Sequence, residues 1–285
     1  MMKELEILEN PRVREYYADM DVKSVNIHED IISLPEYIFG ECRNLISVTF
    51  PKSLVKIGRS AFYNCRKLKK AVINGNISDV ADGAFRNCES LDEIVLKNVD
   101  EEDCCLKNII PELEQPIFIT LEMIDGEKAK LFLPRTIYAF EANEPARTFM
   151  QEDYGSGVYY RQCVNLSKID FAKYDSVFEV AKNEESIKTV MKISFARLMF
   201  PYRLADKDKE RYINYIKTNI KKIFEIIILS EDEEKLDFLL GLKEIDEKDV
   251  KVGIELAQRF ERPRMALKIL SFAGKSGSGE EIMEL

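Results

Sequence analysis

The chain has 285 residues, enough for two domains, and 46% of them are hydrophobic, which is ordinary for a globular protein and argues against intrinsic disorder. Its 51 acidic and 42 basic side chains give a formal net charge of -9, which repels a phosphate backbone and argues against nucleic acid as a partner. No apolar run approaches the ~18 residues of a membrane-crossing helix, so we expect no membrane span.

The first twenty residues carry acidic side chains where a secretory signal needs a basic start and an uninterrupted apolar stretch. The acidic residues are Glu4, Glu6, Glu9, Glu15 and Asp19. This pattern predicts a cytoplasmic protein, although a chain whose signal has been removed would look the same. Residues 3–19 also place apolar side chains at roughly helical spacing, so we expect a helix there that caps the following domain. The apolar positions are Leu5, Leu8, Val13, Tyr16 and Tyr17.

A period of 23 residues then recurs in four kinds of side chain at once. The repeated positions are Phe39, Phe62 and Phe85; Cys42, Cys65 and Cys88; Leu45, Leu68 and Leu91; and Leu34, Ile57 and Val80. Each unit is too small to bury its apolar side alone, but stacked coils merge these sides into one core. The sequence therefore predicts a solenoid, with Gly58, Gly75, Gly83, Pro35 and Pro51 in its turns.

Alternating apolar residues follow each repeated Leu and predict one short strand per coil. The pairs are Val48 and Phe50, Ala71 and Ile73, and Ile94 and Leu96, with Val25 and Ile27 one period earlier and Ile117 and Ile119 one period later. Stacking places such strands about 4.8 Å apart in a parallel sheet. We therefore expect about five parallel strands.

The repeats resemble the BspA-like class of leucine-rich repeats. The resemblance is carried by IGRSAFYNCRKL from Ile57 to Leu68 and by DGAFRNCESL from Asp82 to Leu91, and it extends over residues 22–100 and, more weakly, 101–120. It implies a curved solenoid of a class whose known members mostly serve adhesion and protein binding. It implies no catalytic residues.

The cysteines at equivalent coil positions would lie close enough for a disulfide. An odd ladder of three in a chain without a visible signal instead favours thiols that act as small buried hydrophobic groups. The remaining cysteines, Cys104, Cys105 and Cys163, have no metal-ligand spacing, so we predict no metal site and no cofactor.

Two extended segments, 116–124 and 127–133, flank Asp125-Gly126, which is a strong hairpin signal. We expect this hairpin to close the sheet, so that residues 1–140 form the solenoid with its two caps. Residues 141–165 have little periodicity and contain Gly155, Ser156 and Gly157, which predicts a linker.

Residues 166–274 have the character of an α-helical domain, so the predicted class is α+β. Helices are expected at 171–182, 184–199, 206–229, 231–241, 247–260 and 263–273, with Pro201 and Pro263 at helix boundaries. Ser230 and Glu233 predict a capping box at the start of the fourth helix. Residues 206–274 resemble a degenerate ankyrin-like repeat that lacks the family's Thr-Pro-Leu-His start, and residues 275–285 are expected to form a flexible tail.

Alternate strand residues point out of the core, which makes them the candidate binding surface on the concave face of the solenoid. They are Ser24, Asn26, Ser47, Thr49, Lys70, Val72, Glu93 and Val95. These small, polar and mixed-charge side chains suit a protein or peptide partner better than a cofactor. The alternative is that the face is merely solvated.

Five further patterns favour ordinary structural roles over chemistry. Gly274-Lys275-Ser276 has Ile269 where a phosphate-binding loop needs Gly, and His28 has no second histidine for a metal site or a triad. The sequence leaves open a Cys–His pair that uses Cys104 or Cys105 as a thiol nucleophile, but no family pattern supports it. Glu231–Glu234 suits a helix start, and the Lys/Tyr mixture of 207–222 suits an amphipathic helix.

The sequence therefore predicts a non-enzymatic protein-interaction module in a bacterial-type cytoplasmic setting. One alternative is an adhesin-like surface protein whose signal was removed, which an upstream apolar segment would favour. The other is an enzyme within the helical domain, which a pocket with coupled titratable groups would favour. The sequence does not identify the partner or the oligomeric state.

Overall fold

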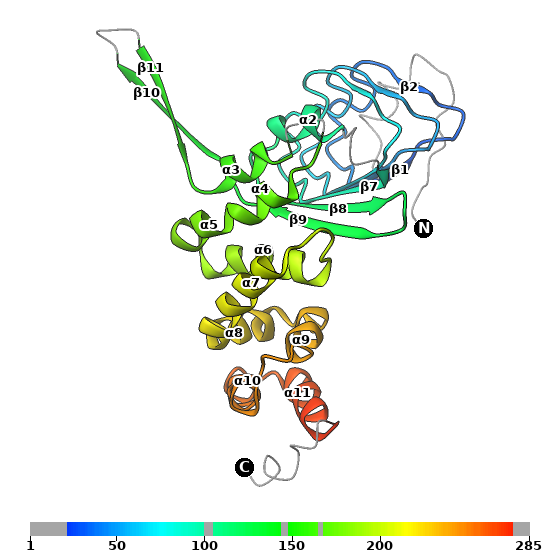
Figure 1. Ribbon diagram of the computed structural model, residues 1–285. Coiled ribbons are helices and arrows are strands. Elements are labelled where there is room, and N and C mark those ends of the chain that lie inside the picture. Colours follow the sequence, from blue (N-terminus) through cyan, green and yellow to red (C-terminus); the bar gives the residue numbers. More distant parts are fainter. Residues whose placement is uncertain (1–21, 100–104, 144–147, 165–167, 276–285) are drawn as a thin grey trace. The chain divides into compact units, whose positions relative to one another are not determined.

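The structure is a computed structural model that describes residues 22–99, 105–143, 148–164 and 168–275 (Figure 1). The chain folds as two compact units. The first unit comprises Met1–Glu184 and Phe200–Leu204, and the second comprises Glu185–Met199 and Ala205–Leu285. The first unit thus extends past the boundary predicted near residue 165. The helix expected at 3–19, Cys104 and residues 276–285 lie outside the described residues.

Five parallel strands of the first unit form one sheet, as the repeat predicted. They are β1 (Ser24–Asn26), β3 (Ser47–Thr49), β5 (Lys70–Asn74), β7 (Glu93–Val99) and β8 (Ile117–Met123). The antiparallel strand β9 (Lys128–Leu133) follows at the edge. A second sheet contains β2 (Ser33–Leu34), β4 (Lys56–Ile57) and β6 (Asp79–Val80). Neighbouring coils pair in steps of 23 residues, so Val25 lies opposite Val48 and Val48 opposite Ala71.

The repeated phenylalanines form a continuous stack inside the solenoid. The ring centroids of Phe39 and Phe62 are 5.0 Å apart, and those of Phe62 and Phe85 are 5.2 Å apart. All three side chains are fully buried. The backbone N–H of Phe39 donates to the Ala61 carbonyl at 2.8 Å, so main-chain bonds join the coils beside the stack. Equivalent side chains therefore occupy equivalent positions in successive coils, which confirms the predicted solenoid.

The cysteine ladder consists of buried thiols, as predicted. Cys42, Cys65 and Cys88 form no disulfide. The Cys65 thiol donates to the Phe39 carbonyl at 3.1 Å, and the Cys88 thiol donates to the Phe62 carbonyl at 3.2 Å. Burial raises the pKa of the Cys42 thiol to about 11 and that of the Cys88 thiol to about 12. These thiols are therefore structural hydrogen-bond donors with little thiolate character at neutral pH.

The last coil departs from the 23-residue step because it contains the short helix α2 (Leu106–Ile109) and the 3-10 turn η1 (Ile110–Glu112). Ile94 consequently pairs with Ile119, where the period predicted Ile117. The inserted turn also places the Glu112 side chain next to the preceding coil, within hydrogen-bond distance of its main chain.

Glu112 and Gln115 replace the hydrogen bonds that a further coil would supply. The Glu112 carboxylate accepts the backbone N–H groups of Gly83 and Phe85, the second at 3.1 Å. The Gln115 amide donates to the carbonyls of Cys88 at 2.9 Å and Leu91 at 3.0 Å. Buried main-chain groups at the end of the array are thereby satisfied by side chains.

The predicted hairpin at Asp125-Gly126 is confirmed. β8 and β9 pair in antiparallel register across the turn, where Gly126 has a φ of +88° that disfavours other residues. The outer edge of β9 is also covered. The Tyr174 hydroxyl both donates to the Phe132 carbonyl at 2.8 Å and accepts its N–H at 2.9 Å, and Ala129 bridges to Pro201.

The segment predicted as a linker contains regular structure. β10 (Ile137–Asn143) pairs with β11 (Thr148–Tyr154) in an antiparallel hairpin between β9 and the helices that follow (Figure 1). Three short helices follow, α3 (Gly157–Gln162), α4 (Phe171–Ser176) and α5 (Phe178–Glu184), so the helix predicted over 171–182 is interrupted at Val177.

Arg161 attaches α3 to the end of the solenoid. Its buried guanidinium donates to the Leu113 carbonyl at 3.0 Å and to the Gln115 carbonyl at 2.8 Å, and it also donates to the Pro134 carbonyl. The backbone of α3 lies so close to that of Arg135 that a Cβ on Gly157 would be 2.2 Å from the Arg135 carbonyl oxygen. These contacts fix α3 against the end of the solenoid, within the first unit.

The second unit is entirely helical in its described part. It contains α6 (Ile187–Met199), α7 (Asp206–Thr218), α8 (Ile220–Ser230), α9 (Glu233–Leu240), α10 (Glu247–Arg259) and α11 (Pro263–Lys275). Helix α8 packs against α10, and α9 packs against α11. Ion pairs join α9 to α11, with Glu233 2.6 Å from Arg264 and Asp237 2.8 Å from Lys268. The ankyrin-like character of these helices stays a prediction.

Two local predictions in this unit are wrong. The helix expected over 206–229 is divided at Asn219, whose side-chain amide donates back to the Tyr215 carbonyl at 3.0 Å. The cap of α9 is Asp232, which accepts the Lys235 N–H at 3.1 Å, and the predicted capping residue Ser230 ends α8 instead.

Candidate protein-binding surface

The eight predicted surface residues lie in two rows on the side of the six-stranded sheet that points away from the core. This side is called here the outward face. The first row is Ser24, Ser47, Lys70 and Glu93, and the second is Asn26, Thr49, Val72 and Val95. Seven of these side chains are exposed or half-buried. Val95 departs from the prediction because it is only 8% exposed.

The first row is polar and internally paired. The hydroxyls of Ser24 and Ser47 are 2.9 Å apart. Farther along, Lys70 Nζ is 2.7 Å from Glu93 Oε2, and both side chains remain partly open to solvent. An ion pair of this kind contributes only about 0–1 kcal/mol to stability. Its charges can therefore be used by a partner with little effect on folding.

The second row becomes apolar toward the hairpin. Val72 is half-buried and Val95 is buried, and the next residues in register are Thr120 and Lys130. Lys130 Nζ lies 5.1 Å from the centroid of the Phe118 ring, within cation–π range. The outward face therefore changes from small polar groups at β1 to apolar and cationic groups at β8 and β9.

Sequence reasoning missed this β8–β9 part of the outward face. Phe118 packs on Phe132 with ring centroids 4.7 Å apart, and both belong to the hairpin that the sequence analysis treated only as a cap. The alternation of buried Ile117, Ile119 and Leu121 already placed Phe118 and Thr120 on the opposite side. That signal would have found them.

The other sequence candidates fall into structural positions. His28 Nδ1 is 3.0 Å from Asp30 Oδ2 at the exposed surface, and Cys105 is buried. Gly274 and Lys275 belong to helix α11, which ends where a phosphate-binding loop would have to begin a helix. Within the described ranges, His, Cys, Asp and Glu side chains form no group of three or more that could hold a metal ion.

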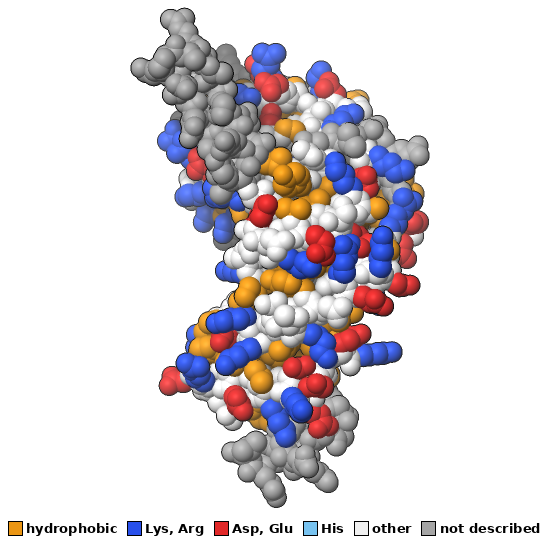
Figure 2. Space-filling model, turned by 60° about the vertical axis from the view of Figure 1, so that its left-hand side comes forward, with side chains coloured by type: hydrophobic (Ala, Val, Ile, Leu, Met, Phe, Trp, Pro, Cys, Tyr) orange, Lys and Arg blue, Asp and Glu red, His pale blue; other side chains and the backbone are white. Residues whose placement is uncertain are grey.

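The charged clusters of the second unit are also part of its helices. Glu231 lies 3.0 Å from Arg262, and Lys222 lies 2.9 Å from Glu225. Tyr212, which interleaves with the lysines of α7, is fully buried and so belongs to the core of the unit. Figure 2 shows acidic and basic side chains interspersed with hydrophobic ones over the surface in view. This face presents no uniform basic field of the kind that gathers nucleic acid.

None of the helices in the described part of the chain combines the length and apolar character that a membrane crossing requires.

Comparison with known proteins places the repeat region. Residues 13–115 match the model of the BspA type leucine rich repeat region in six copies. No curated protein matches the chain. Among solved structures, a leucine-rich repeat protein from Eubacterium ventriosum shares 17% identity over 36% of this chain and 40% of that protein, with a TM-score of 0.21. The chain thus spans less than half the length of that protein. The solenoid is therefore similar to BspA type leucine-rich repeats, a family that generally serves protein–protein interaction.

Proposed function

We propose that this chain is a non-enzymatic interaction module that binds a protein or peptide on the outward face. The observation that carries the proposal is the position of the Lys70–Glu93 ion pair beside the half-buried apolar residue Val72. Protein interfaces combine an apolar centre with a polar, hydrated rim. The two rows of this face supply both within neighbouring strands.

The small side chains of β1 and β3 support the same proposal. Ser24, Ser47 and Thr49 project little from the sheet, so a partner can approach the strands closely there. Val72 gives that partner apolar surface, and Lys70 and Glu93 offer one charge of each sign. Because charge complementarity selects partners more than it adds affinity, the ion pair is expected to determine specificity.

The proposal is tested by reversing both charges in one variant, Lys70→Glu with Glu93→Lys. The double reversal keeps an opposite-charge pair within the chain, so the midpoint of thermal unfolding should stay near that of the wild type. A partner that reads the charge pattern now meets the wrong sign at both positions. Capture from lysate, measured by quantitative mass spectrometry, should lose the partner.

The second sheet offers a matched control. Lys56 and Asp79 face each other in register with Nζ and Oδ2 2.8 Å apart, and both are exposed. The double reversal Lys56→Glu with Asp79→Lys should therefore leave capture unchanged. Equal capture by both double variants would show that the outward face is the wrong surface.

A further inference from the structure

A cluster of cations lies along one edge of the six-stranded sheet, outside the two rows of the outward face. The segments that lead into β1, β3 and β5 supply its members, which are called here the cationic edge. They are Lys23, Arg43, Arg66, Lys67 and Lys69, and all of these side chains are exposed. The chain as a whole carries a net charge of -9, so the cationic edge is a local reversal of the overall sign.

An exposed apolar side chain lies within the cationic edge. The Ile46 N–H donates to the Lys23 carbonyl at 2.7 Å, and the Lys69 N–H donates to the Ile46 carbonyl at 2.7 Å, so these three residues stack in successive coils. Stacked strands lie about 4.8 Å apart. Ile46 is 38% exposed. A partner that binds here therefore meets an apolar group between cationic residues of the two neighbouring coils.

One carboxylate belongs to this region, and it is already occupied. Glu41 Oε2 is 2.9 Å from Arg43 Nη2, and the Glu41 carboxylate also accepts the Asn64 side-chain amide at 2.8 Å. Arg66 Nε in turn donates to the Asn64 side-chain oxygen at 2.8 Å. This network offsets the charge of Arg43 and fixes the Arg66 guanidinium through a neutral group, which leaves the Arg66 charge without a counter-ion.

The remaining cations of the cationic edge are also uncompensated. Lys67 Nζ lies 2.9 Å from the Asn44 side-chain oxygen, which is neutral. Within the part of the chain that the structure describes, Arg66, Lys67 and Lys69 form no ion pair. Their charges are therefore available to an anion from outside the chain.

The sign of the charge changes in the next coil. The Asp92 N–H donates to the Lys69 carbonyl at 3.1 Å, so Asp92 continues the stack of Lys69, and Glu89 stands one period after Arg66. A long polyanion such as nucleic acid would meet these two carboxylates as well as the overall negative charge. A short acidic segment fits the limited extent of the cationic edge better.

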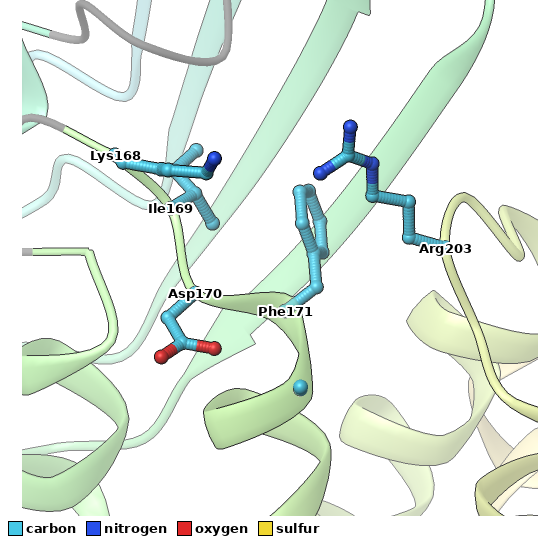
Figure 3. A pocket seen from close by; sticks show the side chains of 6 residues that line it. Lys168, Ile169, Asp170, Phe171 and Arg203 are labelled. Atoms are coloured by element: carbon cyan, nitrogen blue, oxygen red, sulfur yellow. The ribbon is translucent and has the colours of Figure 1, made fainter.

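A pocket of about 370 Å³ at the start of α4 also contains charged side chains (Figure 3). Its Asp170 carboxylate accepts the Lys173 N–H at 2.8 Å and caps the helix. The Arg203 guanidinium carbon lies 5.7 Å from the centroid of the Tyr202 ring. These charges interact within the chain, whereas those of Arg66, Lys67 and Lys69 are open to solvent.

We propose that the cationic edge binds a short acidic segment of a partner protein in which carboxylates flank an apolar side chain. The apolar side chain would pack on Ile46, and the carboxylates would accept hydrogen bonds from Arg66 and Lys69 on one side and Lys23 on the other. Guanidinium and ammonium groups form their strongest hydrogen bonds with carboxylates. The cationic edge lies outside the two rows, so this binding does not depend on the proposed function of the outward face.

The absence of tryptophan from the sequence allows a direct measurement. The probe is the peptide acetyl-Gly-Glu-Glu-Trp-Glu-Glu-Gly-amide, whose indole is then the only tryptophan fluorophore in a titration with the full chain. At an ionic strength of about 0.05 M we expect a saturable change in tryptophan emission with a Kd of about 1 mM or below. The same peptide with Gln in place of each Glu should bind at least about fivefold more weakly, because it lacks the charges. No saturation at millimolar protein, or equal binding of both peptides, would overturn the proposal.

Charge neutralisation locates the binding. The double variant Arg66→Gln with Lys69→Gln should raise the Kd of the Glu peptide about fivefold. The matched control, Arg59→Gln with Lys52→Gln, removes the same charges from exposed positions outside the cationic edge and should leave the Kd unchanged. Should the first double variant fail to fold, Lys69→Gln alone decides the test, with an expected rise of about twofold. An equal effect in both double variants, or unchanged affinity in Lys69→Gln, would refute the site.

The apolar contact has its own matched pair of variants. Ile46→Asp places a negative charge among the cations and should abolish saturation by the Glu peptide. Ile32→Asp makes the same change at another exposed isoleucine, which is 63% exposed and lies outside the cationic edge. This control should bind the peptide with wild-type affinity. Wild-type affinity in a folded Ile46→Asp variant would contradict the proposed contact.

The outcome is distinguishable from that of the proposed function. Val72→Asn removes apolar surface from the outward face without a change of charge, so it should weaken partner capture there and leave the affinity for the Glu peptide unchanged. Loss of peptide binding in Val72→Asn would assign the peptide to the outward face and overturn the proposal. Tighter binding of a short oligothymidylate than of the Glu peptide, in a competition titration, would assign the cationic edge to nucleic acid and overturn it as well.

Discussion

Replacement of Glu112 by Ala tests how the array of coils ends. The Glu112 carboxylate accepts the N–H groups of Gly83 and Phe85, both of which are buried. A buried donor left without an acceptor costs about 1–3 kcal/mol, so two such donors cost about 2–6 kcal/mol. Removal of the half-buried carboxylate also removes the cost of its own burial. We therefore expect Glu112→Ala to lower the free energy of unfolding by about 2–4 kcal/mol.

The pH dependence of the same contact has a definite sign. Burial raises the pKa of Glu112, while the N–H groups of Phe85 and Gly83 act in the opposite direction. A raised pKa in the folded state means that the native protein holds the proton more tightly than the unfolded chain does. The stabilisation that protonation of Glu112 provides is fully present below a pH of about 4.5, the ordinary pKa of a glutamate. It is lost as the pH rises through the raised pKa of the folded state. The stability advantage of the wild type over Glu112→Gln should therefore shrink over that interval.

Urea unfolding of the full chain measures the loss, and amide hydrogen exchange locates it. The N–H groups of Gly83 and Phe85 should exchange faster in Glu112→Ala. The control is Glu114→Ala, because Glu114 is exposed and two residues away. Neutral surface substitutions change the free energy of unfolding by no more than ~0.5 kcal/mol. A change of that size in Glu112→Ala, with both amides still protected from exchange, would refute the capping role.

Three further predictions concern the core of the first unit. Phe62→Ala should cost about 3–5 kcal/mol in urea unfolding, because Phe62 stacks on phenylalanines of both neighbouring coils, and Phe62→Leu should cost less. Tyr174→Phe should cost about 1–3 kcal/mol, since its hydroxyl makes two buried hydrogen bonds with Phe132, and unchanged stability would contradict that role. At pH 8, iodoacetamide should leave Cys42 and Cys88 unmodified in the native protein and label them in urea, because burial raises the pKa of these thiols to about 11 and about 12. Mass spectrometry after labelling of the native protein checks this. Rapid labelling would show that the coils open and expose the cysteines.

The solenoid could be predicted because each coil repeats the same residue types at the same positions. Phe39, Phe62 and Phe85 must stack once their coils do, so one period fixed the register of four strands. The step to β8 could not be read from that period, because α2 and η1 add two residues to the last coil and Ile119 takes the place expected for Ile117. Val95 is buried although strand alternation places it on the outward face, so alternation alone does not predict its exposure.

The remaining differences arise where local signals were ambiguous. Apolar spacing continues from Ile216 through Ile220 to Ile223, so nothing in the periodicity marks the break at Asn219. Ser230 and Asp232 are both good N-cap residues, and only the fold determines which of them caps α9. Of the candidate surface, the positions of the two rows followed from the strand alternation.

The covered edge of β9 has a consequence for how this molecule can meet others. An exposed strand edge is a template on which a second chain can extend a sheet, and it is a common start of fibrous aggregation. At Phe132 the main-chain donor and acceptor are already taken by a tyrosine hydroxyl, and a proline stands opposite Ala129. Growth of the sheet by addition of a foreign strand is blocked at these positions, which leaves recognition on this side to side chains.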